Sequence, residues 1–103
     1  MRVLVLADDY WHPAAVVREG LAPLAAQGYD FDWMADGSAW SAAGMADYPL
    51  VILSKSNNTT QADKAPWVTP EVEQAFVDYV RAGGGLLVLH SGTVYKDTEI
   101  LRP

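Results

Sequence analysis

The sequence predicts a single α/β domain of three layers, in which helices cover both faces of a doubly wound parallel sheet. Short apolar runs alternate with segments of helical periodicity along the 103 residues. Glycine and proline separate these segments, as expected at the ends of strands and helices. The last run, Leu86 to Leu89, has no polar alternation, which predicts a parallel strand covered on both faces.

The first third of the chain predicts a strand, a helix and a second strand. Residues 3–7 are apolar throughout and form the first strand. A helix is expected over residues 13–27, with a proline in its first turn and Gly28 at its end. Pro23 should kink or shorten this helix, because proline donates no backbone hydrogen bond. In residues 29–34 the aromatic Tyr29, Phe31 and Trp33 alternate with Asp30, Asp32 and Met34, which predicts an edge strand.

The remaining elements follow the same logic. Residues 35–47 predict a loop with one helical turn, and residues 50–53 predict a short buried strand. Residues 54–68 predict a long polar loop, and loops of this length in compact domains are often functional. Thr69 is a suitable cap for a helix that begins with a proline and an acid and that stops at Gly83.

Charge and composition narrow the classes of function. The net charge of −6 argues against nucleic acid and anionic membrane as partners, because both need basic patches. The absence of cysteine excludes disulfides, thiolate metal sites and a cysteine nucleophile. The apolar amino terminus is interrupted by Asp8 and Asp9, so it is neither a signal peptide nor a membrane span. We therefore expect a soluble, cytoplasmic protein.

The carboxyl-terminal part of the sequence predicts an unfinished sheet. Residues 93–103 resemble the opening of another helix, and four strands make a small doubly wound sheet. The strand at 86–89 would be an unprotected edge unless more chain or a second subunit covers it. We expect the chain to be part of a larger, truncated domain, with a homodimer as the other way to cover this edge.

Polar residues follow three of the strands and should meet at one edge of the sheet. In a flavodoxin-like order, strand 29–34 is outermost, followed by 3–7, 50–53 and 86–89. The carboxyl ends of the last three strands then line one crevice beside the topological switch point. The polar clusters are Asp8, Asp9, Tyr10, Trp11 and His12, then Ser54, Lys55, Ser56 and Asn57, then His90, Ser91, Gly92 and Thr93. Both histidines of the chain fall in this set, which favours a ligand site there.

Simpler interpretations remain open for several of these residues. His12 could cap a helix, His90 could pack against a neighbour, and Asp8 or Asp9 could cap the first helix. A phosphate-accepting receiver domain would need an acid after the third strand, where Ser54 and Lys55 stand. Residues 83–85 precede a strand, so they are not a phosphate-binding loop.

A metal site has little support in the sequence. Two histidines and two acids could hold a divalent ion such as zinc, but no HxH or HxxxH spacing is present. We therefore expect no cofactor.

The motif Gly84-Gly85-Leu86-Leu87-Val88-Leu89-His90-Ser91-Gly92 resembles the ThuA-like (trehalose utilisation) family. Asp9-Tyr10-Trp11-His12-Pro13 and Phe76-Val77-Asp78-Tyr79-Val80 carry the same resemblance. The chain is similar to about the amino-terminal half of a family member. The resemblance implies a fold like that of class I glutamine amidotransferases. In those enzymes this turn holds the catalytic cysteine, and His90 stands at that place here, so a thioester mechanism is not available.

The resemblance also implies a role in disaccharide catabolism, with binding of 3-keto-glycosides and their isomerisation to 2-keto forms through an enediolate. Such chemistry needs a base of near-neutral pKa, which histidine supplies, and donors that face the enediolate oxygen. We expect His90 to be the base, His12 the acid or carbonyl-polarising group, and Lys55 with the amides after His90 the oxyanion donors.

The expected substrate contacts surround this pair. They are Asp9, Asn57, Trp11 as a platform for a sugar ring, Ser91, Gly92 and Thr93. Two alternatives remain open at this point: a keto-sugar-binding or regulatory module without turnover, and an amidotransferase-like hydrolase that lacks the cysteine.

Overall fold

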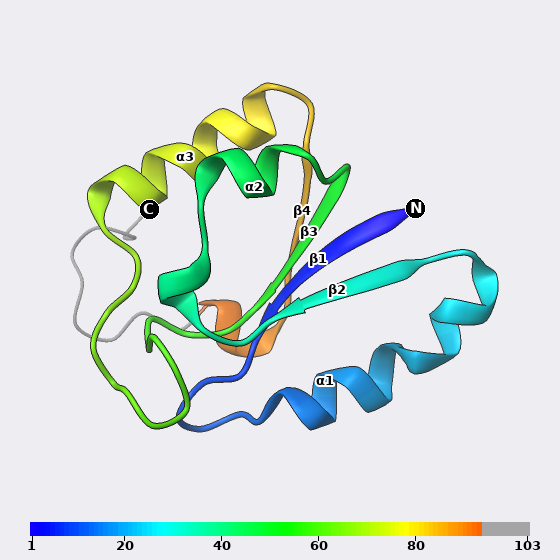
Figure 1. The fold of residues 1–103 in the computed structure, drawn as a ribbon, viewed down its shortest axis with the longest axis horizontal. Helices are drawn as coiled ribbons and strands as arrows, with labels where there is room; N and C mark the ends of the chain where they lie inside the picture. Colours follow the sequence, from blue (N-terminus) through cyan, green and yellow to red (C-terminus); the bar gives the residue numbers. More distant parts are fainter. Residues whose placement is uncertain (94–103) are drawn as a thin grey trace.

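The computed structural model describes residues 1–93 and contains one parallel sheet of four strands in the order β2-β1-β3-β4. This is the strand order expected from the sequence (Figure 1). The strands are β1 (Arg2–Ala7), β2 (Asp30–Met34), β3 (Leu50–Ser54) and β4 (Gly85–Val88). β1 pairs with β2 and β3, and β3 pairs with β1 and β4, so β1 and β3 are the two central strands.

Helices cover both faces of the sheet, as predicted. α1 lies on one face, whereas α2 and α3 lie on the other (Figure 1). The helices are α1 (Ala14–Leu21), α2 (Ala42–Ala46) and α3 (Pro70–Arg81), with 3-10 segments η1 (Ala22–Gln27), η2 (Gly37–Ala39) and η3 (His90–Thr93). The described residues thus form a compact α/β domain of three layers, an arrangement compatible with a flavodoxin-like fold.

Local signals in the sequence determine where the helices begin and end. α1 gives way to a 3-10 segment immediately before Pro23, and Gly28 ends that segment with φ 94°. The Thr69 hydroxyl accepts a hydrogen bond from the amide of Val72, which caps α3 as expected. Gly83 follows α3 with φ 105°, a conformation that glycine adopts without strain.

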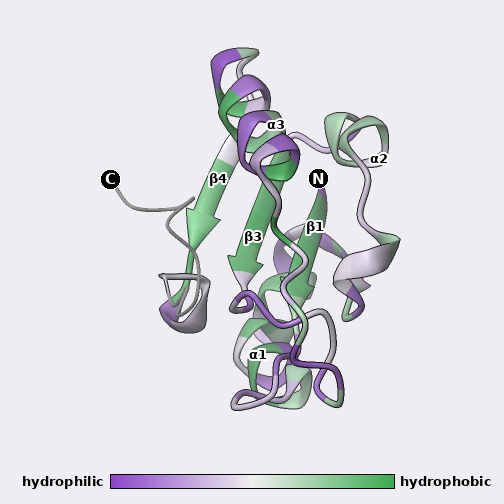
Figure 2. Ribbon diagram, turned by 90° about the vertical axis from the view of Figure 1, so that its left-hand side faces the viewer, coloured by the Kyte–Doolittle hydropathy of each residue, from purple (hydrophilic) through white to green (hydrophobic). Residues whose placement is uncertain are grey.

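Each face of the sheet has its own hydrophobic core. Leu4, Leu6 and Leu53 pack with residues of α2 and α3 on one face. Val3, Val5 and Ile52 pack with residues of α1 on the other. Figure 2 shows hydrophobic strands and largely hydrophilic loops beyond their arrowheads. The sheet is therefore a rigid support for the loops at its carboxyl edge.

β4 is less covered than its apolar sequence predicted. Leu86 packs against the core on the α3 side, but Leu87 is 45% exposed and Val88 39% exposed. Val80 of α3 is 46% exposed. The expectation of burial on both faces is thus wrong for β4 in the described part of the chain, because no described helix packs over the face that carries Leu87. The helix expected over residues 93–103 lies outside the described residues beyond Thr93.

No helix among residues 1–93 combines the length and the apolar character that crossing a membrane requires.

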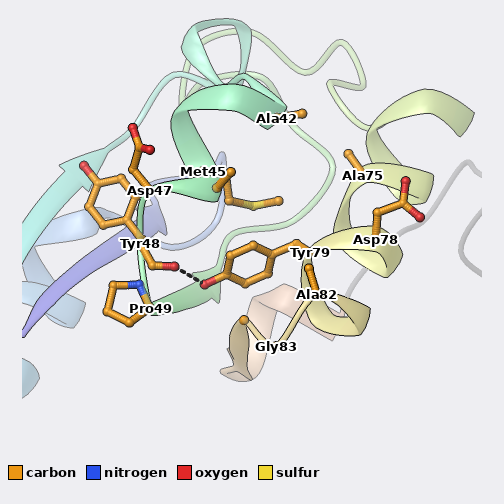
Figure 3. Close-up of a pocket in the computed structure, with 12 residues that line it drawn as sticks. Ala42, Met45, Asp47, Tyr48, Pro49, Ala75, Asp78, Tyr79, Ala82 and Gly83 are labelled. Carbon is orange, nitrogen blue, oxygen red and sulfur yellow. Dashed lines mark hydrogen bonds between the residues drawn. The ribbon is translucent and has the colours of Figure 1, made fainter.

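A hollow of about 580 Å³ lies between α2 and α3, at the amino ends of β3 and β4 (Figure 3). Small residues line much of it, including Ala42, Ala75 and Ala82. Tyr79 extends across this space, and its hydroxyl donates a hydrogen bond of 2.7 Å to the carbonyl oxygen of Tyr48. The tyrosine therefore ties α3 to the segment that enters β3.

Removing this hydroxyl should weaken the fold measurably. We expect Tyr79→Phe to lower the free energy of unfolding by about 1–2 kcal/mol, because the carbonyl of Tyr48 loses its donor. Urea unfolding monitored by circular dichroism measures the change. Tyr29→Phe is the control, since the Tyr29 hydroxyl makes no hydrogen bond within residues 1–93 and the Tyr29 ring packs on Phe31. Equal effects for the two variants would contradict the role given to the Tyr79 hydroxyl.

Candidate functional site

The three polar clusters meet at the carboxyl edge of the sheet, as the strand order requires. The amide of Ser56, after β3, donates to the Asp9 carboxylate after β1 at 3.0 Å. The Ser91 hydroxyl, after β4, donates to the carbonyl oxygen of Ser54 at 3.1 Å. Direct hydrogen bonds therefore join the ends of β1, β3 and β4 into one structural unit.

The turn after β1 is strained, and the side chains of its two aspartates point in different directions. Asp8 has φ 88°, a conformation that costs most residues about 1–3 kcal/mol. Its carboxylate accepts a 2.7 Å hydrogen bond from the amide of Ala14, the first residue of α1. Asp8 thus stabilises the start of this helix, whereas Asp9 points inward and is fully buried.

The buried Asp9 carboxylate accepts hydrogen bonds from the loop after β1 and from the loop after β3. One oxygen accepts from the amides of Trp11 and His12, both at 2.8 Å, and the other accepts from the amide of Ser56. Burial alone would raise the pKa of Asp9, but hydrogen bonds from Ser56, Trp11 and His12 outweigh it and hold this pKa below its ordinary value. Asp9 is therefore an ionised anchor beneath the site.

The two histidines lie in direct contact above this anchor. Their ring centroids are 4.7 Å apart with the rings at 72°. Nδ1 of His12 lies 3.1 Å from the carboxylate oxygen Oδ1 of Asp9. An ionised carboxylate accepts hydrogen bonds and donates none, so Nδ1 carries the proton in this contact and neutral His12 has its lone pair on Nε2. The His12 side chain is 37% exposed and is accessible to a ligand.

The turn after β4 brings His90 to the surface. His90 has φ 39°, a second strained residue at this edge of the sheet. Gly92 packs against the carbonyl of Leu53 so closely that a β-carbon would overlap it. The turn therefore rests directly on the end of β3, and His90 projects outward while Ser91 lies 1% exposed below it.

Tyr10 and Trp11, in the loop that leads to His12, form an exposed aromatic rim. Trp11 is 59% exposed, and its ring meets that of Tyr10 edge-on at 4.6 Å. The ammonium of Lys64 lies 3.7 Å from the ring centroid of Tyr10 and 5.9 Å from that of Trp11. These cation–π contacts bring the loop between β3 and α3 to the loop that follows β1.

The structure divides the expected site residues into an exposed and a buried group. His12, His90, Trp11 and Thr93 are at least partly exposed, and the Thr93 hydroxyl donates to the carbonyl of His90 at 2.8 Å. Lys55, Asp9, Asn57, Ser91 and Gly92 are buried. Lys55 donates to the carbonyl of Asp8, and the Asn57 side chain accepts from the amide of Val68. The buried residues hold the turns together from below, so we place them in support of the site and not in contact with a ligand.

Sequence reasoning missed two parts of this site. Lys64 lies in the middle of a polar loop, and no pattern in the sequence indicated that it reaches Tyr10. Tyr10 was assigned to the first cluster without a role. The strained conformation of Asp8, which directs Asp9 inward, has no signature in the sequence because non-glycine residues rarely adopt it.

The hollow between α2 and α3 is a weaker candidate for the functional site. It lies at the amino ends of the strands, whereas ligands of open α/β sheets bind at the carboxyl ends. The histidine pair and the buried charges gather at the carboxyl edge. Within residues 1–93, no group of three or more potential metal-ligating side chains is brought together.

A scan of protein-family models and searches of curated proteins and solved structures found no match to this chain.

Proposed function

We propose that this chain is a ThuA-like protein that binds a keto-sugar and isomerises 3-keto-glycosides to 2-keto forms through an enediolate. The motif around His90 and the upstream Asp9-Tyr10-Trp11-His12-Pro13 support the family. The observation that carries the chemistry is the contact between the two imidazoles, 4.7 Å apart at the carboxyl edge of the sheet. Two groups that can each hold or release a proton are what a carbonyl shift needs.

His12 is the base in this proposal, and His90 is the acid that polarises the carbonyl. The Asp9 carboxylate accepts a hydrogen bond from Nδ1–H of His12, which leaves a lone pair on Nε2 that faces away from the buried Asp9. The roles expected from the sequence are the opposite, with His90 as base and His12 as acid. We exchange them because no carboxylate within the described residues binds His90 as Asp9 binds His12. Lys55 is fully buried, and the amide of Gly92 donates to the carbonyl oxygen of Leu89, so neither faces the enediolate oxygen and the donor in this proposal is His90.

The proton balance of the reaction fits two imidazoles. Nε2 of His12 takes the proton from the ring carbon next to the carbonyl, and His90 protonates the carbonyl oxygen to give an enediol. A proton then returns to the former carbonyl carbon while the neighbouring hydroxyl loses its proton. The carbonyl has moved by one carbon, and both histidines regain their original protonation.

The exposed aromatic rim supports a carbohydrate ligand. Trp11 presents an indole ring beside His12, and Tyr10 packs against that ring edge-on. Flat aromatic faces with a polar edge suit a sugar ring, which has apolar C–H faces and hydroxyls around its rim. The acidic chain, with a net charge of −6, also favours a small neutral ligand over nucleic acid in a cytoplasmic setting.

Solvent exchange in D₂O provides the test. We expect deuterium to enter the ring carbon beside the carbonyl of a 3-keto-glucoside, with a new keto-sugar in proton NMR spectra. His12→Gln should slow this exchange by about 10²-fold or more, since it removes the base. Val16→Ser, at a position of α1 that is 67% exposed, is the control. Full exchange by folded His12→Gln protein would overturn the assignment of the base.

Binding without turnover is the second candidate, and the rim of Tyr10 and Trp11 favours it. These exposed aromatic rings could hold a sugar without help from either histidine. The same NMR sample separates the two functions. Shifts of the Trp11 ring signals with no deuterium entering the sugar would identify a binding module. The hydrolase alternative has less support, because Ser91 is buried and donates its hydroxyl to a backbone carbonyl.

A further inference from the structure

Lys55 is the largest side chain that is fully buried in the described residues. Its Nζ atom donates a hydrogen bond of 2.6 Å to the carbonyl oxygen of Asp8. Burying an ammonium is costly unless it is paired and hydrogen-bonded, so a lysine at this place needs a specific reason. A hydrophobic side chain would otherwise suit the end of a buried strand.

The carbonyl that Lys55 binds belongs to the strained turn after β1. It is part of the peptide that links Asp8 to Asp9, and Asp8 has φ 88°. A strained conformation persists only where the surroundings hold it. The hydrogen bond from Lys55 fixes this peptide and therefore sets the direction in which the Asp9 side chain leaves the backbone.

Charge supports the same arrangement. Burial lowers the pKa of Lys55, and the carboxylates of Asp9, Asp8 and Asp36 oppose that shift. Asp9 in turn faces the amides of Ser56 and Trp11, the ring of His12 and the hydroxyl of Ser91. Lys55 is the one lysine or arginine side chain that is fully buried within residues 1–93, and the charge of the fully buried Asp9 carboxylate acts on it.

We infer that Lys55 is a positioning residue, whose buried ammonium holds the turn of Asp8 and balances the charge of Asp9, so that Asp9 fixes the tautomer of His12. Lys55 acts through Asp9 and touches no ligand. The inference deepens the proposed function and depends on it for its catalytic meaning, but the tautomer of His12 can be measured without any sugar.

The ring nitrogens of His12 report on this role directly. Long-range ¹H–¹⁵N NMR of the native protein at neutral pH should show His12 protonated at Nδ1. In Lys55→Met protein, we expect the population of this tautomer to fall by more than half and the titration midpoint of the Asp9 carboxyl carbon to rise. Arg81→Met is the control: it removes an exposed cation from the last turn of α3, away from the site, and should leave both readings unchanged. An unchanged His12 tautomer in folded Lys55→Met protein would overturn the inference.

A second measurement covers the case in which Lys55→Met does not fold. In the native protein, the ¹⁵Nζ group of Lys55 should be protected from solvent exchange and that of Lys64 should not. The Asp9 carboxyl should also titrate below its ordinary range. Rapid exchange at Lys55, or an ordinary titration of Asp9, would overturn the inference.

The kinetics of keto-sugar isomerisation provide a third, separate measurement. If the protein isomerises keto-glucosides, folded Lys55→Met should lose about 10- to 100-fold in kcat with a smaller change in KM, because the base is misaligned while the rim stays intact. Absence of turnover in the native protein would count against the proposed function alone. The tautomer measurement would still decide the role of Lys55.

Discussion

Replacing Asp9 by asparagine is expected to lower the free energy of unfolding by about 2–4 kcal/mol. The side chain keeps its shape, but an amide group takes the place of one carboxylate oxygen. If that group faces Ser56, two N–H donors oppose each other inside the protein; if it faces Trp11 and His12, two backbone amides lose their acceptor. Either orientation also leaves the buried Lys55 ammonium without the carboxylate charge.

Urea unfolding at neutral pH measures this loss, and Asp30→Asn is the control. Asp30 is exposed at the start of β2, so its substitution should change the stability by less than about 0.5 kcal/mol. If Asp9→Asn protein lost no more free energy of unfolding than Asp30→Asn protein, the Asp9 carboxylate would not be an anchor of the fold.

The effect of Asp9 should also depend on pH. Its pKa in the folded protein lies below the ordinary value of 3.8, so the unfolded chain takes up a proton first as the pH falls. The stability that Asp9 contributes is therefore fully present above this ordinary value and is lost as the pH falls through the folded pKa. The difference in stability between native and Asp9→Asn protein should shrink over this acidic range.

Gly92→Ala is expected to destabilise the fold by about 3 kcal/mol or more. A β-carbon at this position would overlap the carbonyl oxygen of Leu53 and lie 2.9 Å from Cγ1 of Val88. The Leu53 carbonyl also accepts a hydrogen bond from Leu89, so β3 cannot move aside without losing contacts to β4. The turn itself must shift, which would separate the two histidine rings.

Gly20→Ala provides the opposite result as a control. Gly20 lies within α1 and has no neighbouring atom within 4 Å of an added β-carbon. Alanine is favoured over glycine inside a helix, so this variant should be more stable by about 0.5–1 kcal/mol. Thermal unfolding of both variants tests the comparison. Equal stabilities of Gly92→Ala and native protein would mean that the turn is not packed on β3.

Much of the fold could be predicted because its signals are local. Apolar runs predicted three of the strands, and the alternation of residues 29–34 predicted the fourth. Thr69 and Pro23 marked helix boundaries that the structure confirms. The coverage of β4 could not be predicted in this way. An apolar run indicates that a strand can be buried, but it does not say which element packs on each face, and Leu87 is in fact 45% exposed.

The sequence predicted where the site lies, but not which of its residues are buried and which are exposed. Strand order brought the three clusters together, and the contact of His12 with His90 follows from that order. Charged residues at strand ends are normally exposed, so Asp9 and Lys55 were expected to face a ligand. Their burial depends on one unusual backbone conformation at Asp8 and on hydrogen bonds between distant segments, which no local pattern encodes.

Those hydrogen bonds have a consequence for how the chain folds. The partners of both links, Lys55 to Asp8 and Ser56 to Asp9, are 47 residues apart in the sequence. Closing so long a loop costs entropy that is recovered only once β1 and β3 have paired. The site is thus a late product of folding and not a preformed local motif. A ligand that binds there selects molecules in which the sheet is already complete, and so acts as a stabiliser of the whole domain.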